Sequence, residues 1–292
     1  MQILSFDDYR QQASALAEAL QGNCERIRLH RFPDGESLVQ LPSGLDDHLV
    51  ICQSLHFPND KLVELYLAAK SARQHGVKRL TLVAPYLCYM RQDKAFIPGQ
   101  AVSQQIIGSF LGDLFDDVVT VDPHLHRIER LDQAIPCRNA VALTAAGLLG
   151  DFVTDRFANA VFIGPDEESE QWVKVVAQPG DVDYVVASKI RYGDKSVAIE
   201  LPDYDFSGRT ALLVDDVISS GHTVAETARE LQKKGVSEVL ALCTHALLAP
   251  GAEKLLEENG VDRLISTDSI PHSSNEIQLA PLLAEAVKKL ED

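Results

Sequence analysis

The sequence predicts an α/β fold of two similar doubly wound domains with mainly parallel sheets. Short apolar runs alternate with amphipathic segments along almost the whole of the 292 residues, and this alternation is typical of parallel α/β folds. Several runs are continuously apolar, as expected for strands buried on both faces of a sheet. The strand–helix pattern occurs once in each half of the chain. Two domains of about 150 residues each agree with the usual domain size.

The predicted strands are short runs rich in Val, Ile and Leu. Continuous runs of this length, bounded by polar segments, favour strands over helices. They are Ile27–His30, Leu49–Cys52, Leu80–Ala84, Val118–Val121, Ala160–Ile163, Val182–Val186, Ala211–Val214, Val239–Cys243 and Leu264–Ser266.

The predicted helices lie between these runs and carry apolar residues at positions i, i+3, i+4 and i+7. The spacing is clearest in residues 62–69, and Gly76 follows as a stop signal. Residues 13–20, before Gly22, and residues 224–231, before Gly235, repeat the spacing. Further helices are expected at 146–152, 171–177 and 282–290.

The best candidate for a domain boundary between the two halves lies near Leu143–Ala145. We therefore expect an N-terminal domain over residues 1–144 and a C-terminal domain over residues 145–280. The final segment, residues 281–292, is a candidate to pack on the N-terminal domain.

Composition excludes several classes of function. The chain carries 27 basic and 43 acidic side chains and a formal net charge of −16, whereas nucleic acids and anionic membranes recruit basic surfaces. No apolar run approaches the roughly 18 residues needed to span a bilayer, and the start lacks the pattern of a secretory signal. The five cysteines form no CxxC pair, which indicates reduced thiols. We expect a cytoplasmic protein with no nucleic-acid or membrane partner.

The most informative segment is LLVDDVISSGHT, residues 212–223, where an apolar strand runs into a short polar loop before a helix. The loop's backbone N–H groups and the hydroxyls of Ser219, Ser220 and Thr223 can surround a phosphate at the positive end of that helix. Gly221 allows close approach of the backbone to a ligand. The segment therefore predicts a cradle for a sugar phosphate.

Two adjacent carboxylates, Asp215 and Asp216, close the same strand. They can accept hydrogen bonds from ribose hydroxyls or bind Mg²⁺, and ligands of open α/β sheets bind at this end of the strands. A simple helix cap needs no such pair, because two neighbouring carboxylates repel each other. The whole segment resembles the phosphoribosyl-diphosphate-binding motif of the phosphoribosyltransferase fold, although His222 stands where many members have Gly or Ala.

Further segments resemble the ribose-phosphate diphosphokinases, which share this phosphoribosyltransferase-like fold. Residues 32–36, FPDGE, and residues 85–94, PYLCYMRQDK, look like that family's two ATP-site loops. An aromatic face can stack on adenine and an arginine can clamp phosphate oxygens. The resemblance implies ATP binding by Phe32, Asp34, Gly35, Glu36, Arg91 and Gln92.

The resemblance extends to the metal and catalytic positions. Residues 121–124, VDPH, and residues 164–166, GPD, look like the family's metal-binding strands, which implies Mg²⁺ ligation by His124 and Asp166. Lys189 and Arg191 stand where the family carries its catalytic loop, and a mobile cationic loop suits stabilisation of a transferring diphosphoryl group. The implied ribose 5-phosphate site comprises Arg191, Asp215, Asp216, Ser219, Ser220, Gly221, His222 and Thr223.

Taken singly, these residues have ordinary explanations. Phe32 could be a packing residue, His124 a strand-end histidine, and Lys189 a solvated surface charge. The chain also departs from the family: residues 41–47 lack the arginine of the regulated members, and Glu167-Glu168 follows Asp166 where many members have a glycine pair.

The resemblance implies an Mg²⁺-dependent enzyme that transfers the diphosphoryl group of ATP to the 1-hydroxyl of ribose 5-phosphate. It also implies a homo-oligomer, a dimer or higher, assembled through the N-terminal halves. Two alternatives stay open. A phosphoribosyltransferase would share residues 212–223 but would not need the ATP loops, and an inactive regulator of a true synthase would bind nucleotide without releasing AMP.

Overall fold

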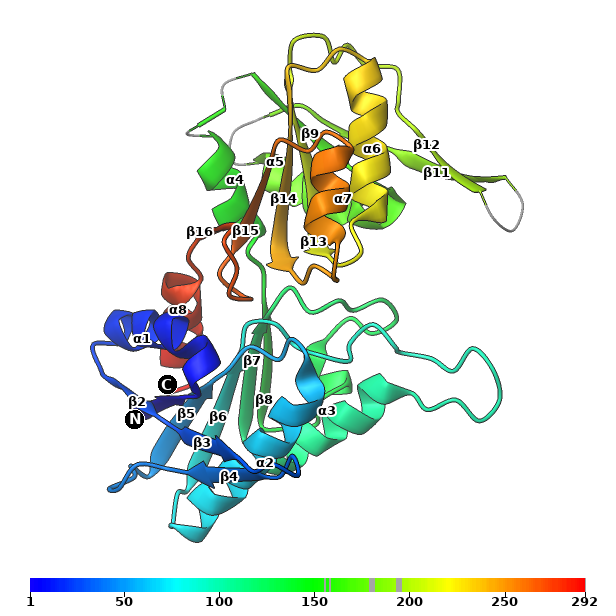
Figure 1. The fold of residues 1–292 in the computed structure, drawn as a ribbon. Coiled ribbons are helices and arrows are strands. Elements are labelled where there is room, and N and C mark those ends of the chain that lie inside the picture. The colour runs from blue at the N-terminus through cyan, green and yellow to red at the C-terminus, as the bar shows by residue number, and fades with distance from the viewer. Residues whose placement is uncertain (155, 158, 179–181, 193–195, 292) are drawn as a thin grey trace. The chain divides into compact units, whose positions relative to one another are not determined.

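A computed structural model describes residues 1–154, 156–157, 159–178, 182–192 and 196–291, with the side chains of residues 168, 190–192 and 196–198 excepted. The chain divides into two compact units (Figure 1). Unit 1 comprises Met1–Leu143 with Leu279–Asp292, and unit 2 comprises Thr144–Gln278. Each unit contains a six-stranded sheet with helices on both faces, so the predicted fold class is confirmed.

The sheet of unit 1 is parallel throughout. Its strands follow the order β2-β1-β5-β6-β7-β8. Their bounds are β1 (Gln2–Ser5), β2 (Cys24–Arg26), β5 (His48–Cys52), β6 (Arg79–Ala84), β7 (Asp117–Val121) and β8 (Asn139–Leu143).

Helices cover both faces of this sheet (Figure 1). One face packs Leu4, Leu49 and Ile51 against the apolar stripes of two helices, in which Leu65 and Leu111 are buried. The other face is covered by the first and last helices, which pack side by side. The helices are η1 (Asp7–Tyr9), α1 (Arg10–Ala19), α2 (Pro58–Gln74), α3 (Ser103–Leu114), η2 (Leu131–Gln133) and α8 (Ala280–Lys289).

The sheet of unit 2 is also parallel and follows the order β10-β9-β13-β14-β15-β16. Its strands are β9 (Ala160–Gly164), β10 (Tyr184–Val186), β13 (Thr210–Ile218), β14 (Glu238–Ala246), β15 (Arg263–Thr267) and β16 (Asn275–Ile277).

Alternate side chains of the central strand β13 enter two separate cores. Leu213 packs with the buried side chains of α6 and α7, whereas Leu212 and Val214 pack with those of α4 and α5. This period of two explains why the strand is apolar at every position along its first half. The helices are α4 (Ala146–Thr154), η3 (Glu167–Ser169), α5 (Glu170–Ala177), α6 (His222–Lys233) and α7 (Ala252–Glu258).

Each unit also inserts an antiparallel hairpin between the second and third strands of its sequence. The hairpins are β3 (Arg28–Arg31) with β4 (Ser37–Gln40), and β11 (Ser188–Tyr192) with β12 (Ser196–Glu200). The strand predicted at Ile27–His30 is present as β3, but it pairs in a hairpin and not in the parallel sheet. The loop predicted at Lys189–Arg191 is wrong, because this segment lies in a strand that pairs with residues 196–200.

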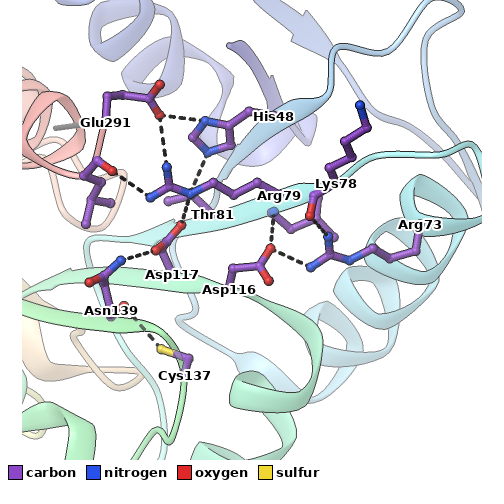
Figure 2. Close-up of polar contacts among 12 residues, drawn as sticks. His48, Arg73, Lys78, Arg79, Thr81, Asp116, Asp117, Cys137, Asn139 and Glu291 are labelled. Atoms are coloured by element: carbon purple, nitrogen blue, oxygen red, sulfur yellow. Dashed lines mark hydrogen bonds and ion pairs between the residues drawn. The ribbon is translucent and has the colours of Figure 1, made fainter.

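The chain returns to unit 1 through α8, and a polar network binds its end to the amino edge of the sheet (Figure 2). The Arg79 guanidinium donates to the Leu290 carbonyl at 2.8 Å and to Asp117 Oδ2 at 2.7 Å. His48 Nδ1 lies 2.7 Å from a carboxylate oxygen of Glu291. Asp117 is fully buried, so these hydrogen bonds compensate the loss of its hydration. Among the helices in the described part of the chain, none has the length and apolar composition that a bilayer crossing needs.

Candidate functional site

Asp215 and Asp216 lie inside β13, near its carboxyl end, because the strand continues to Ile218 and is longer than the predicted Ala211–Val214. The Asp216 N–H donates to Asp215 Oδ1 at 2.9 Å, and the Val217 N–H donates to Asp216 Oδ1 at 2.8 Å. Burial, and next the neighbouring charge of Asp216, raise the pKa of Asp215 well above its usual range. The ionised form of Asp215 is thus disfavoured, and a bound cation or hydroxyl donor would stabilise that form.

The loop after β13 turns sharply into α6. Gly221 has φ of 76°, and a Cβ at this position would lie 3.3 Å from Leu256 Cδ2. Glycine is therefore required both by the left-handed backbone and by the close approach of α7. Gly221 is the N-cap of α6 and supplies no side-chain hydrogen bond to the first N–H groups of the helix, which are the groups that bind anions at helix N-termini.

A backbone brace that the sequence did not reveal supports this loop. The N–H groups of Leu247 and Leu248 both donate to the Ile218 carbonyl, at 3.1 and 3.0 Å, and the Ala249 N–H donates to the Ser219 carbonyl at 2.9 Å. Leu248 has φ of 38°, a conformation that costs a non-glycine residue about 1–2 kcal/mol. The three donors come from backbone groups, so no side-chain motif marked them.

A lysine and a carboxylate from the predicted site meet at the same edge. Lys189 Nζ lies 2.6 Å from Asp166 Oδ2, and Asp166 also accepts the Ser169 N–H at 3.2 Å to cap η3. The charge of Asp166 contributes to the raised pKa of Asp215, after burial and Asp216. Asp166 thus forms an ion pair with Lys189 and acts through its charge on Asp215. The side chain of Arg191 lies outside the described residues.

Unit 1 carries the predicted ATP-loop residues. Phe32 to Glu36 form the exposed turn of the β3–β4 hairpin, closed by a 2.8 Å hydrogen bond from the Phe32 N–H to the Glu36 carbonyl. The Phe32 ring is 40% exposed and makes an edge contact with His30 at 4.8 Å between ring centroids. A half-exposed aromatic ring of this kind leaves a face on which a nucleobase can stack.

The second predicted ATP loop is anchored through Gln92. Its amide oxygen accepts the Ser103 N–H at 3.1 Å at the start of α3, and its amide nitrogen donates to the Ala101 carbonyl at 2.5 Å. Arg91 is exposed. Gln92 thus ties its own segment to the start of α3, and Arg91 is the exposed residue of the pair.

The two predicted metal ligands belong to different units. His124 follows the carboxyl end of β7 in unit 1, and its ring lies 4.2 Å from that of His126 in an edge contact. Asp166 belongs to unit 2. Across the described residues, no group of three or more His, Cys, Asp or Glu side chains is arranged to hold a metal ion. The adjacent carboxyl groups of Asp215 and Asp216 nevertheless suit Mg²⁺, which takes carboxylate oxygens and keeps several waters.

Two parallel α/β units, each with an inserted hairpin and one with a Ser/Gly/Thr loop beside paired carboxylates, define a phosphoribosyltransferase-type two-domain protein. Residues 1–113 match the family model of the N-terminal domain of ribose phosphate pyrophosphokinase, and residues 194–291 match that of the phosphoribosyl synthetase-associated domain. The chain belongs to the ribose-phosphate pyrophosphokinase family.

Relatives and a solved structure agree with this membership. The chain is 36% identical to a ribose-phosphate pyrophosphokinase of Methanopyrus kandleri over 94% of each chain. It is 33% identical to that of Methanosarcina acetivorans over 95% of this chain and 96% of the relative. Phosphoribosylpyrophosphate synthetase from Mycobacterium smegmatis has the same fold, with a TM-score of 0.82, 23% identity and coverage of 100% and 99% of the two chains.

Proposed function

We propose that this protein is a ribose-phosphate diphosphokinase, a transferase of nucleotide biosynthesis. The 1-hydroxyl of ribose 5-phosphate attacks the β-phosphorus of ATP, the bond to the α-phosphate oxygen breaks, and AMP leaves. The product is 5-phosphoribosyl 1-diphosphate. The family membership supports this reaction. The observation that carries it in this chain is that Asp166 pairs with Lys189 and acts on Asp215, which precedes the loop of residues 219–223 in the same segment.

In this proposal unit 2 holds the sugar phosphate. The 5-phosphate binds the first N–H groups of α6 and the hydroxyls of Ser219, Ser220 and Thr223, with His222 exposed beside them. Asp215 and Asp216 accept hydrogen bonds from the ribose hydroxyls and so orient the 1-hydroxyl. Lys189 and Arg191 stabilise the negative charge of the transferring group.

Unit 1 holds the nucleotide in this proposal. Phe32 stacks on adenine, Asp34, Gly35 and Glu36 surround the nucleoside, and Arg91 binds phosphate with Gln92 fixing its segment. Asp166 and His124, each in its own unit, are the proposed Mg²⁺ ligands, and bound Mg²⁺ would neutralise phosphate charge and polarise the transferring group. A strongly acidic chain that binds two polyanions needs such compensation, since its net charge is −16.

An assay of AMP formation tests the proposal. The protein is incubated with ATP, Mg²⁺ and ribose 5-phosphate, and AMP and ADP are separated by chromatography. We expect AMP to form only when ribose 5-phosphate is present. A phosphoribosyltransferase would release no AMP and would instead consume 5-phosphoribosyl 1-diphosphate with a base, and an inactive regulator would bind ATP without turnover.

The assembly and location are part of the same proposal. Exposed apolar side chains on α2, namely Val63, Tyr66 and Leu67, support a homo-oligomer joined through unit 1, because such a stripe is rarely left in water. All five cysteines are free thiols, which supports a cytoplasmic setting. Light scattering on the purified protein should give at least a dimer, and a monomer at micromolar concentration would contradict the assembly.

A further inference from the structure

The exposed turn at residues 32–36 is held at its base by the closing pair of the hairpin. Arg31 and Ser37 lie opposite each other in the β3–β4 register. Inside the turn, the Gly35 N–H donates to the Phe32 carbonyl at 2.9 Å, and the Glu36 N–H contacts Asp34 Oδ1 at 3.2 Å. These bonds shape the turn, but they do not fix its orientation relative to the rest of unit 1.

One buried carboxylate contacts both residues of the closing pair. Glu64 lies on α2 and is only 4% exposed. Its Oε1 accepts a hydrogen bond from Arg31 Nη2 at 2.8 Å and lies 3.5 Å from Ser37 Oγ. One helical turn earlier, the exposed Asp60 lies 3.0 Å from Arg31 Nη1. The hairpin thus lies against α2 (Figure 1) through a charged contact at its base.

A carboxylate in this position costs free energy unless it is paired. Glu64 sits among the apolar residues of α2, with Leu65 and Ala68 fully buried beside it. An apolar residue would serve the packing of the helix equally well. The arginine contact therefore accounts for the charge, and it holds the base of the hairpin against α2 together with the packing of Leu29 and Val39 on the core.

We propose that Glu64 is a positioning residue for the nucleotide: through Arg31 it fixes the orientation of the turn at residues 32–36. This inference rests on the proposed function, in which that turn binds ATP. Glu64 is buried and reaches the nucleotide only through Arg31 and Ser37. Its removal should therefore weaken nucleotide binding and leave the ribose 5-phosphate site of unit 2 unaffected.

The variant Glu64→Gln tests the proposal, because the amide keeps the size of the side chain and loses the charge. We expect the Kd of the Mg²⁺ complex of ATP, measured by equilibrium dialysis, to rise about tenfold, an effect of 1.4 kcal/mol. The Kd of ribose 5-phosphate should stay unchanged. Hydrogen exchange of the peptide containing residues 32–36 should become faster. Glu18→Gln, an exposed glutamate on α1, is the matched control and should show none of these changes.

A double variant separates positioning from general stability. If Glu64 acts through Arg31, then Glu64→Gln should change ATP binding little in a protein that already carries Arg31→Ala. Additive effects of the two substitutions would overturn the proposal. Equal weakening of both substrates together with a lower Tm would also overturn it, since that result indicates damage to the whole unit.

The proposed function and the positioning role can fail separately. If the wild-type protein binds ATP but releases no AMP, the diphosphokinase proposal fails, and dialysis on Glu64→Gln still decides the role of Glu64. If the wild-type protein binds no ATP, or if Glu64→Gln binds it as tightly as wild type, the positioning role is contradicted.

Discussion

The third strands of the two sheets, β5 and β13, occupy the same topological place but end in opposite electrostatic environments. Beyond β5, Gln53 donates to Asp8 at 2.9 Å and Lys61 lies 2.7 Å from the same carboxylate. Burial raises the pKa of Asp8, but the hydrogen bond and charge of Lys61 outweigh it and the net shift is downward. At the end of β13, burial and Asp216 raise the pKa of Asp215.

The contrast indicates that the same strand order supports a structural ion pair in unit 1 and the candidate ligand site in unit 2. The edge of unit 1 near β5 pairs the half-exposed carboxylate of Asp8 with a cation of the same unit, Lys61, which indicates a structural role. The corresponding edge of unit 2 places two carboxylates side by side, and there burial and the charge of Asp216 raise the pKa of Asp215. Ligand binding in unit 1 is proposed to lie instead on its hairpin and on the segment before α3.

The largest expected effect is at Lys189. The substitution Lys189→Ala should lower kcat by about 100-fold, because a cation that stabilises the transferring group contributes roughly 2.7 kcal/mol to the transition state. The Kd of ribose 5-phosphate should change less than twofold. Steady-state AMP release checks this expectation, and Lys254→Ala, an exposed lysine on α7, is the control. Near-normal turnover would remove Lys189 from the mechanism.

The next effect tests whether the unit 1 edge is structural. Asp8→Asn should destabilise the protein by about 2 kcal/mol, because it leaves the largely buried ammonium of Lys61 without its anionic partner. Urea unfolding followed by circular dichroism measures this change. The Kd of ribose 5-phosphate should be unaffected in the folded variant. Weaker ribose 5-phosphate binding would mean that this edge also takes part in the site.

Glycine 221 offers a sharper test of the loop in unit 2. Gly221→Ala should destabilise the protein by about 1 kcal/mol and raise the Kd of ribose 5-phosphate several-fold, because the new Cβ meets Leu256 and disfavours the left-handed backbone. The matched control is Gly208→Ala, since Gly208 also has a positive φ, of 67°, but no atom lies within 4 Å of its would-be Cβ. Equal Kd values for both variants would show that the loop does not contact the phosphate.

The smallest expected effect is an opposite dependence of stability on pH in the two units. The lowered pKa of Asp8 contributes stability above its unfolded value near 3.8, and this contribution is lost as pH falls through the folded pKa. The raised pKa of Asp215 contributes stability that is complete below about 3.8 and is lost as pH rises through the folded pKa.

Hydrogen exchange in metal-free buffer should resolve the two contributions. With intrinsic exchange rates corrected for pH, amides of β13 should be less protected at pH 7 than at pH 5, and Asp215→Asn should abolish that difference. Amides of β5 should lose protection below pH 4. The same sign of slope in both units would contradict the assigned electrostatics.

Much of the fold could be predicted because strands buried on both faces leave continuous apolar runs, as in Leu80–Ala84 and Ala160–Ile163. The strand β1, Gln2–Ser5, was missed because it is short and includes two polar residues. The hairpins were missed because pairing depends on a partner elsewhere in the chain. The sequence of residues 28–31 does not by itself indicate whether the strand pairs in a parallel sheet or in an antiparallel hairpin.

The candidate site also contains features that could be predicted from the sequence and features that could not. Asp215, Asp216 and the loop to Thr223 are contiguous, so the chemistry of one segment reveals them. The brace from Leu247–Ala249 is formed by backbone N–H groups, which any sequence could supply. The contact between Arg31 and Glu64 joins residues that are far apart in sequence, and only the packing of the hairpin on α2 brings them together.

The central claim is that the carboxyl edge of unit 2, and not that of unit 1, binds ribose 5-phosphate. Hydrogen exchange with and without saturating ribose 5-phosphate tests it most directly. The account predicts slower exchange in peptides covering residues 216–226 and no change in peptides covering residues 53–60. Protection at residues 53–60, or none at residues 216–226, would contradict it.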